Sequence, residues 1–250
     1  MTGIYGEDAE LYDIAFDWDI EGEADWLVAR LGRECRDVLE PGCGTGRMLE
    51  ALARRGLEVV GIDSSEHMVE YARRRLAAAG VEGEVVLADM ADFDLGRRFG
   101  GAVCPINTLG HLAPDDVDRH FALMAQHLGR GARYLVQVGL PLDADELWRS
   151  EWVAERGETR VEIVWEALGR DRASGRELAR SRLEVVSGPR SGEVVEDEHV
   201  MTVWTAATWR ETVARSPFTQ VACYDGNLPG RPQVEPEQGG GLLWHELVAA

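Results

Sequence analysis

The 250-residue sequence contains no lysine, so all 26 of its basic residues are arginine. This absence excludes a P-loop lysine, a lysine Schiff base of the kind used with pyridoxal phosphate, and a lysine general base. Arginine cannot replace lysine in these reactions, because its guanidinium stays protonated in proteins. Whatever the protein does, it does without a lysine.

Positive charge is also scarce overall, since 45 acidic residues oppose the arginines and the net charge is −19. A surface this negative repels phosphate backbones and anionic membranes, so we expect neither a nucleic-acid nor a membrane partner. A local arginine pocket for an anionic substrate remains compatible with this charge.

Cysteine pairs and long apolar runs are absent as well. The sequence has four cysteines, none within a C-x-x-C pair, which predicts free thiols in a reducing cytoplasm, with no disulfide framework and no metal site: Cys35, Cys43, Cys104 and Cys223. The acidic N-terminus has no apolar signal region, and no apolar run approaches the roughly 18 residues of a membrane span. We therefore expect a cytoplasmic protein.

Short apolar runs alternate with helical patterns over the first 140 residues. The expected strands are 37–40, 57–62, 84–88, 102–106 and 134–138, and the helices between them are 46–55, 64–79 and 114–129. Strands separated by single helices favour right-handed crossovers and a parallel sheet covered on both faces.

The pattern changes after Pro141. Residues 152–204 hold longer alternating stretches separated by glycine-rich turns, which is typical of antiparallel hairpins. A helix at 206–215 and strands at 218–224 and 242–248 then return to the earlier style. We expect an α/β domain built from 1–140 and 205–250, with seven mostly parallel strands, and an antiparallel insertion at 141–204.

The most informative motif is the segment from Glu40 to Gly46, which reads E-P-G-C-G-T-G between an expected strand and an expected helix. Alternating glycines let a backbone turn tightly and approach a ligand, and the helix behind offers unpaired N–H groups. Asp63 ends the next strand, where a ribose diol is bound in a βαβ nucleoside site. A dinucleotide motif would need a third glycine at Arg47 or Leu49, which disfavours a nicotinamide oxidoreductase.

These motifs together resemble the class I S-adenosylmethionine-dependent methyltransferases, whose fold is Rossmann-like with helices on both faces of the sheet. The resemblance implies that the glycine loop cradles the methionine part of the cofactor, that Asp63 binds the ribose, and that Asp89-Met90 meets the adenine. The cofactor-binding residues it implies are Glu40, Gly42, Cys43, Gly44, Gly46, Asp63, Ser64, Met68, Asp89, Met90 and Asn107.

A closer resemblance is to sugar N,N-dimethyltransferases. It rests on Tyr12-Asp13, on the segment 89–99, on Gly110-His111-Leu112 and on the hairpin insertion. It implies that Tyr12 lies near the reacting end of the cofactor and His111 near the acceptor. The segment 137–141 lacks the acidic, tryptophan-rich character of these relatives, so the resemblance carries the cofactor and not the acceptor.

Two residues are expected to be catalytic, each with an alternative. His111 follows the fourth strand of the sheet and acts either as a general base or as an orienting hydrogen-bond partner, because proximity alone can carry methyl transfer. Tyr12 either closes over the cofactor or packs against Phe16 and Trp18. Asn107 either touches the methionine moiety or caps a turn.

The other histidines carry plainer expectations. His67 is expected to be exposed, and His120 and His127 share one helix face, which predicts a solvated face or pairing at the helix end. His199 is expected on an exposed acidic strand.

Tryptophans and arginines concentrate in or beside the insertion. The tryptophans either wall an acceptor pocket or build the core of the insertion: Trp148, Trp152, Trp165 and Trp204. The arginines either pair with surface acids or receive an anionic substrate: Arg149, Arg156, Arg160, Arg180 and Arg182.

The sequence as a whole predicts an S-adenosylmethionine-dependent methyltransferase of specialised metabolism that releases S-adenosylhomocysteine. The expected partner is a small-molecule acceptor methylated on nitrogen or oxygen, and an exposed strand edge on the insertion suggests a possible homodimer. The alternative is a protein that binds the cofactor without methylating, such as a cyclase or a regulatory module.

Overall fold

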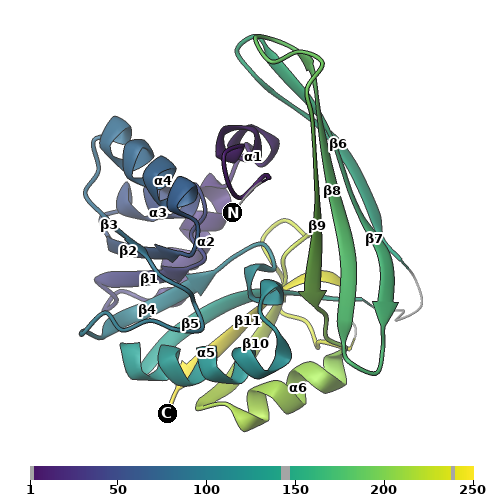
Figure 1. The fold of residues 1–250 in the computed structure, drawn as a ribbon. Helices are drawn as coiled ribbons and strands as arrows, with labels where there is room; N and C mark the ends of the chain where they lie inside the picture. The colour runs from purple at the N-terminus through teal and green to yellow at the C-terminus, as the bar shows by residue number, and fades with distance from the viewer. Residues whose placement is uncertain (1–2, 142–146, 238–239) are drawn as a thin grey trace.

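A computed structural model describes residues 3–141, 147–237 and 240–250 of the chain, and it contains a seven-stranded sheet of order β10-β11-β5-β4-β1-β2-β3 (Figure 1). Only β11 runs against its neighbours, so the predicted mostly parallel α/β sheet is confirmed. The strands are β1 (Asp37–Pro41), β2 (Glu58–Asp63), β3 (Glu84–Leu87), β4 (Phe99–Cys104), β5 (Leu128–Leu140), β10 (Phe218–Asp225) and β11 (Gly241–Ala249).

Helices cover both faces of this sheet and bury two separate cores. On one face, Leu27, Leu49 and Val69 represent the core under α2, α3 and α4. On the other face, Phe121 and Trp209 lie in the core under α5 and α6. The helices are α1 (Ala9–Ala15), α2 (Glu21–Leu31), α3 (Arg47–Ala53), α4 (Glu66–Ala79), α5 (Pro114–His127) and α6 (Ala206–Arg215). None of the described helices is long and apolar enough to span a membrane.

Local signals set the ends of the helices. Ser65 caps α4 by accepting a hydrogen bond from the Met68 N–H, and Gly80 ends it in the left-handed conformation. Pro114 stands at the first position of α5, followed by two aspartates at the positive end of the helix dipole. Ser65 thereby places the N-terminus of α4 directly after the carboxyl end of β2.

The chain between β5 and α6 forms a second, four-stranded antiparallel sheet of order β6-β7-β8-β9. Its strands are β6 (Arg149–Arg156), β7 (Thr159–Asp171), β8 (Arg176–Ser187) and β9 (Val194–Thr202). The hairpins were predicted, although β6 was not separated as a strand of its own. Residues 142–146, where the insertion was predicted to begin, lie outside the described residues.

The second sheet packs on the N-terminal segment, defined here as residues 3–17. Figure 1 shows α1 lying between α4 and this sheet. Ile4 and Leu11 of the segment, Met68 of α4, and Val161 and Leu183 of the sheet are buried in one cluster. The N-terminal segment is thereby held over the carboxyl ends of β1 and β2, where ligands bind in parallel sheets.

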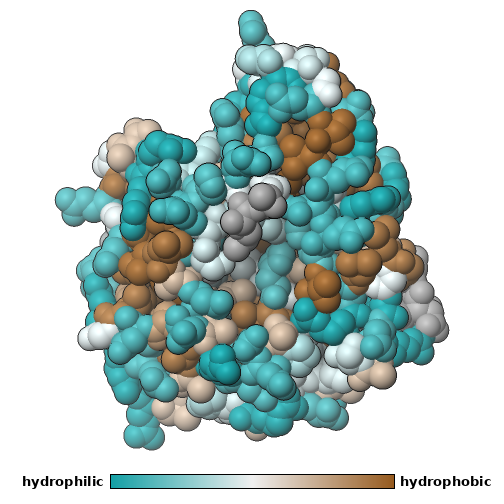
Figure 2. All heavy atoms as spheres, in the orientation of Figure 1, coloured by the Kyte–Doolittle hydropathy of each residue, from teal (hydrophilic) through white to brown (hydrophobic). Residues whose placement is uncertain are grey.

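Hydrophilic side chains cover most of the face shown in Figure 2, as expected for a chain with a large excess of acids. Apolar patches interrupt that face, and the exposed apolar side chains include Val153, Val194 and Val200 of the second sheet.

Candidate active site

Three glycines turn the chain between β1 and α3. Gly42, Gly44 and Gly46 have φ angles of 66°, 52° and 78°, a conformation that side-chain-bearing residues rarely adopt. A Cβ atom on Gly46 would lie 2.9 Å from the Cβ of Ala72, and one on Gly42 would lie 2.4 Å from the Cγ2 of Thr108. The loop is therefore packed closely against α4 on one side and against the loop after β4 on the other.

Glu40 is a buried carboxylate beside this loop. It is only 2% exposed, and its Oε2 has no hydrogen-bond partner among the residues that the structure describes. Burial, together with the neighbouring charge of Asp63, raises the pKa of Glu40 well above its ordinary value. A buried carboxylate is costly unless a cation pairs with it. This oxygen therefore fits the ammonium of the methionine moiety of S-adenosylmethionine.

Asp63 ends β2 and braces the glycine loop. Its two carboxylate oxygens accept hydrogen bonds from the Gly44 N–H at 2.8 Å and the Ser65 N–H at 2.9 Å. Burial raises the pKa of Asp63 despite these two bonds. Each oxygen keeps a second lone pair, so this position remains suited to a ribose hydroxyl.

Tyr12 lies over the glycine loop and packs on Phe16, so the expected packing is found, whereas its closure over the cofactor stays a prediction. A Cβ on Gly44 would stand 3.8 Å from the Cε1 of Tyr12, and the Tyr12 ring stacks on Phe16 with centroids 4.4 Å apart. Burial raises the pKa of Tyr12, so its phenol is neutral at physiological pH.

Arg47 lines the same cleft, along with Tyr12, Glu40 and the glycine loop. Its Nη2 donates to the Trp18 carbonyl at 2.6 Å, and no carboxylate pairs with it among the described residues. The sequence shows this residue only as a missing dinucleotide glycine, because the cleft that it shares with Glu40 is completed by the N-terminal segment. A ligand carrying both an ammonium and a carboxylate matches this pair of opposite charges.

Asp13, next to Tyr12, anchors the N-terminal segment. Its fully buried carboxylate lies 2.5 Å from Nη2 of Arg75, 2.8 Å from Nη1 of Arg156 and 2.9 Å from the hydroxyl of Tyr71. Although burial opposes it, these partners and a hydrogen bond from Thr45 hold the pKa of Asp13 below its ordinary value. One carboxylate thus joins α1, α4, β6 and the glycine loop.

The segment after β3 holds the predicted adenine-binding pair. Asp89 is exposed and its Oδ1 accepts the Ala91 N–H at 2.8 Å. The carbonyl of Met90 lies 2.8 Å from Nδ1 of His120, whose Nε2 lies 2.9 Å from the hydroxyl of Tyr134. His120 therefore positions the backbone of the pair, a role that sequence reasoning missed.

The expectation of a solvated face for His120 and His127 is wrong. His67 is exposed as predicted, but His120 is 0% and His127 3% exposed. Their spacing does place both on one face of α5, and that face is the one that carries Phe121 toward the sheet. Nε2 of His127 accepts the Leu95 N–H at 2.9 Å, so both rings support the chain that follows β3.

Three other predicted cofactor residues have different surroundings. Ser64 is exposed, and the neighbouring Ser65 makes the helix cap. Cys43 is buried against Gly61, so only its backbone faces the cleft. Met68 is 1% exposed within the cluster shared by the N-terminal segment and the second sheet.

Asn107 serves the turn after β4. It has a positive φ of 60°, and its Oδ1 accepts the Gly139 N–H at 2.9 Å. Of its two expected roles, the structure shows the turn, which ties this loop to β5.

His111 meets two residues from other parts of the chain. Its Nε2 lies 3.3 Å from the hydroxyl of Tyr5, and its ring lies 6.0 Å from that of His199 between centroids. The residue is exposed, and the rings of Tyr5 and His199 lie against its imidazole. Burial, with a contribution from His199, lowers the pKa of His111 to about 4. The imidazole is therefore neutral at physiological pH.

The expectation of an exposed position for His199 is wrong, because it is 8% exposed. Along β9, Glu196 and Glu198 point outward, whereas Asp197 and His199 point inward. Alternation within the acidic run could have revealed this orientation. Oδ2 of Asp197 accepts the N–H of Ile4 at 3.1 Å, which ties β9 to the N-terminal segment.

Most of these tryptophans and arginines stabilise the fold through packing and ion pairs. Trp152 and Trp165 pack against the cluster of the N-terminal segment, Trp204 is buried in the core under α6, and Trp148 is exposed. Ion pairs with nearby acids hold the arginines Arg149, Arg156, Arg160, Arg180 and Arg182.

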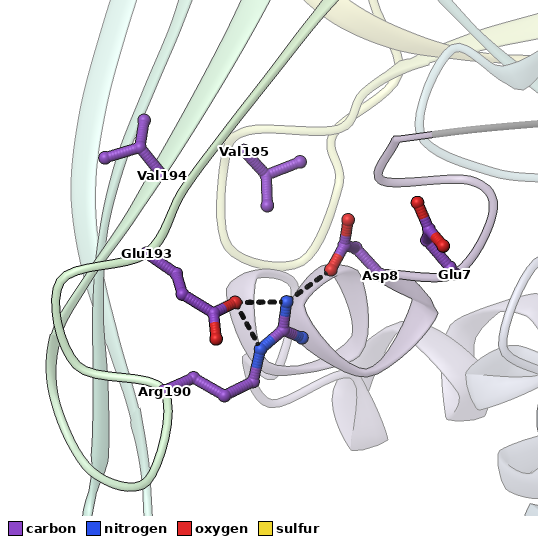
Figure 3. A pocket seen from close by; sticks show the side chains of 6 residues that line it. All are labelled: Glu7, Asp8, Arg190, Glu193, Val194 and Val195. Atoms are coloured by element: carbon purple, nitrogen blue, oxygen red, sulfur yellow. Dashed lines mark hydrogen bonds and ion pairs between the residues drawn. The ribbon is translucent and has the colours of Figure 1, made fainter.

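A hollow between the N-terminal segment and the turn joining β8 to β9 is also held by charges (Figure 3). Arg190 lies 2.6 Å from both Asp8 and Glu193 across it. Because the guanidinium of Arg190 already pairs with two carboxylates, we interpret this hollow as a contact that holds the two segments together. Its lining residues are Glu7, Asp8, Arg190, Glu193, Val194 and Val195.

A glycine loop after β1, acids ending β1 and β2, and a seven-stranded sheet with one reversed strand define a Rossmann-like methyltransferase. Residues 38–131 match the family described as "Methyltransferase domain". The chain is 32% identical to a dTDP-3-amino-3,6-dideoxy-alpha-D-glucopyranose N,N-dimethyltransferase of Streptomyces fradiae, over 91% of this chain and 88% of that one.

Two further proteins are similar over most of their length. A dTDP-3-amino-3,4,6-trideoxy-alpha-D-glucopyranose N,N-dimethyltransferase of Streptomyces venezuelae is 29% identical over 82% of this chain and 84% of that one. The solved structure of an amino pentose methyltransferase from Micromonospora echinaspora has a TM-score of 0.72 and 20% identity, covering 98% of this chain and 99% of that one.

The chain belongs to the S-adenosylmethionine-dependent methyltransferase family. It transfers a methyl group from this cofactor to a small-molecule acceptor in specialised metabolism. The predicted class of enzyme and its cofactor are therefore confirmed, and nothing supports the alternative of a non-methylating protein.

Proposed function

We propose that the protein methylates the amine of a small amino sugar. The observation that carries this proposal is the contact of His111, in the turn after β4, with the N-terminal segment, because its Nε2 lies 3.3 Å from the hydroxyl of Tyr5. The curated relatives described above act on nucleotide-linked amino sugars, which supports the same class of acceptor.

We assign the two ends of the cofactor's amino-acid part to opposite sides of the cleft. Glu40 binds the ammonium and Arg47 the carboxylate, while the amides of Gly42 and Gly44 line the turn between them. Asp63 binds the ribose, and Asp89 with the Met90 amide binds the adenine. When bound, S-adenosylmethionine supplies a methyl group activated by its sulfonium charge.

The lowered pKa of His111 favours nitrogen over oxygen as the acceptor atom. A hydroxyl needs a base with substantial proton affinity, and a histidine with a pKa of about 4 is a weak one. A neutral amine needs no base before it attacks, because its lone pair is free. We assign His111 the role of accepting an amine N–H hydrogen bond, so that the lone pair points toward the methyl group.

The site also excludes the wrong form of the acceptor. An ammonium would bring a second positive charge next to the sulfonium, whereas a neutral amine would not. Tyr12, which packs on Tyr5, lines the cleft from the N-terminal segment and limits the access of water.

Paired acceptors test this proposal. The enzyme is incubated with methyl-labelled S-adenosylmethionine and either dTDP-3-amino-3,6-dideoxyglucose or the matched sugar with a hydroxyl at carbon 3. We expect one and then two methyl groups on the amine, and no transfer to the hydroxyl sugar. Methylation of the hydroxyl sugar at a similar rate would refute the assignment of an amine acceptor.

Two finer points accompany this proposal. β6 and β9 are the edge strands of the second sheet, and an exposed edge is able to pair with a second copy of the chain. A homodimer through this edge is a proposal that light scattering tests directly. A cytoplasmic location is likewise a proposal, and it rests on the free thiols.

A further inference from the structure

His199 brings a second imidazole to the acceptor side of the site, from the insertion. The rings of Tyr5, His111 and His199 surround one another, with centroids 5.2 Å apart for Tyr5–His199 and 5.3 Å apart for Tyr5–His111. Each ring comes from a different part of the chain: the N-terminal segment, the loop after β4, and β9. Nothing in the assignments above uses His199.

The imidazole of His199 is held in one orientation. It stacks on Trp165 with centroids 5.3 Å apart and planes 18° apart, and its Nε2 lies 3.0 Å from the hydroxyl oxygen of Ser181. Ser181 is itself 0% exposed. Trp165 is in turn packed edge-on against Phe16 of the N-terminal segment.

The other ring nitrogen, Nδ1, has no hydrogen-bond partner in the ranges 3–141, 147–237 and 240–250. Burial lowers the pKa of His199 although Asp197 opposes this, so the ring stays neutral, with one donor and one acceptor. An imidazole nitrogen without a protein partner, on a ring whose orientation is fixed, is free to hydrogen-bond a ligand.

Successive methylation of an amine makes such a hydrogen bond necessary. A primary amine offers two N–H groups, and each transferred methyl removes one, so the amine cannot by itself keep the sugar in place through two transfers. Recognition must come from substituents that do not change. The hydroxyls on the carbons next to the amine are the nearest such groups.

We propose that His199 is a specificity-determining residue whose Nδ1 binds a hydroxyl on a carbon adjacent to the acceptor amine. This inference rests on the proposed function. His111 and His199 then hold neighbouring substituents of the same ring, His111 the amine and His199 the hydroxyl. Ser181 and Trp165 set the direction in which Nδ1 points. The insertion thereby selects amino sugars that carry a hydroxyl beside the amine.

The test compares His199→Phe with the unaltered enzyme on three acceptors. These are dTDP-3-amino-3,6-dideoxyglucose, its 4-deoxy analogue, and its 2-deoxy analogue. Phenylalanine keeps the stack on Trp165 and removes the ring nitrogens. We expect kcat/KM for the parent sugar to fall about tenfold to a hundredfold, and to change less than threefold for the one deoxy sugar that lacks the contacted hydroxyl.

Equal losses on all three sugars, or no loss on the parent, would overturn the inference. Calorimetric binding of S-adenosylhomocysteine shows whether the variant is folded, and we expect its Kd to stay within twofold of that of the unaltered enzyme. Ser181→Ala is the second variant, because it frees the ring without removing it. We expect it to give a smaller loss with the same preference among the sugars, and an equal loss on all three would again count against the inference.

Failure of the proposed function has a different signature. If the unaltered enzyme methylates none of the three amines while it binds S-adenosylhomocysteine, the amino-sugar acceptor itself is wrong, and the role of His199 falls with it. If the unaltered enzyme methylates all three and His199→Phe does not discriminate among them, only the role of His199 is wrong.

Discussion

Replacement of Gly44 by alanine separates the cost of an unusual backbone from the cost of a blocked cofactor site. The φ of Gly44 is 52°, and an added Cβ would meet Tyr12 at 3.8 Å, an ordinary contact. The added methyl group causes no clash in the folded chain, so the loss of stability comes only from the left-handed backbone and is roughly 1–2 kcal/mol. Gly56 is a matched control, because its φ is 84° and its Cβ would meet nothing within 4 Å.

The two variants should therefore lose similar stability and differ in cofactor affinity. The added methyl group of Gly44→Ala enters the space where we place the methionine moiety, and overpacking of this kind costs about 1–3 kcal/mol. That range corresponds to roughly 5- to 150-fold weaker binding. Chemical denaturation measures the stabilities, and calorimetry with S-adenosylhomocysteine measures the affinities. If Gly44→Ala binds this ligand as tightly as Gly56→Ala, the glycine loop is not the cradle we describe.

Three other substitutions give distinct expectations. Glu40→Gln replaces a buried carboxyl group whose Oε2 has no partner, so thermal melting should show unchanged or raised stability. Calorimetry should show at least tenfold weaker binding of S-adenosylhomocysteine, and unaltered affinity would contradict the ammonium site. Burial lowers the pKa of His120 to about 4, so stability should fall as the pH drops from about 6.5 toward 4, by about 1.4 kcal/mol per pH unit for this residue. Urea unfolding at pH 7 and pH 5 should give a shallower dependence for His120→Asn, and an unchanged slope would refute this account. Arg156→Gln should lower the free energy of unfolding by about 1–3 kcal/mol, because it leaves the buried carboxylate of Asp13 without one of its partners. The surface variant Arg160→Gln should change this free energy by less than about 1 kcal/mol. Similar losses for the two variants in urea unfolding would argue against the anchor at α1.

Much of the fold follows from local sequence patterns. The seven strands of the main sheet and the caps of α4 and α5 lie where periodicity and capping residues indicate, because these signals are short-range. β6 was missed because its outer positions are exposed and its alternation is weak, so only pairing with β7 defines it. β5 extends from Leu128 to Leu140, well beyond the predicted 134–138, because Leu128 pairs with Phe99 of β4, a long-range contact that the local pattern does not show.

The residues of the site likewise fall into those that a local motif predicts and those whose surroundings come from distant segments. The glycine loop, Glu40 and Asp63 are close in sequence, so their motif predicts their proximity. His120 and His199 were misplaced because a pattern shows which residues share a face and not what covers that face. Arg47 was seen only as a missing glycine, because the N-terminal segment that completes its cleft comes from another part of the chain.

The most direct test of the central claim is a crystal structure with S-adenosylhomocysteine and dTDP-3-amino-3,6-dideoxyglucose bound together. We predict that the ammonium of the cofactor product contacts Glu40 and that the amine of the sugar lies within hydrogen-bond distance of His111. An ammonium bound away from Glu40, or a sugar amine beyond hydrogen-bond distance of His111, would contradict the account.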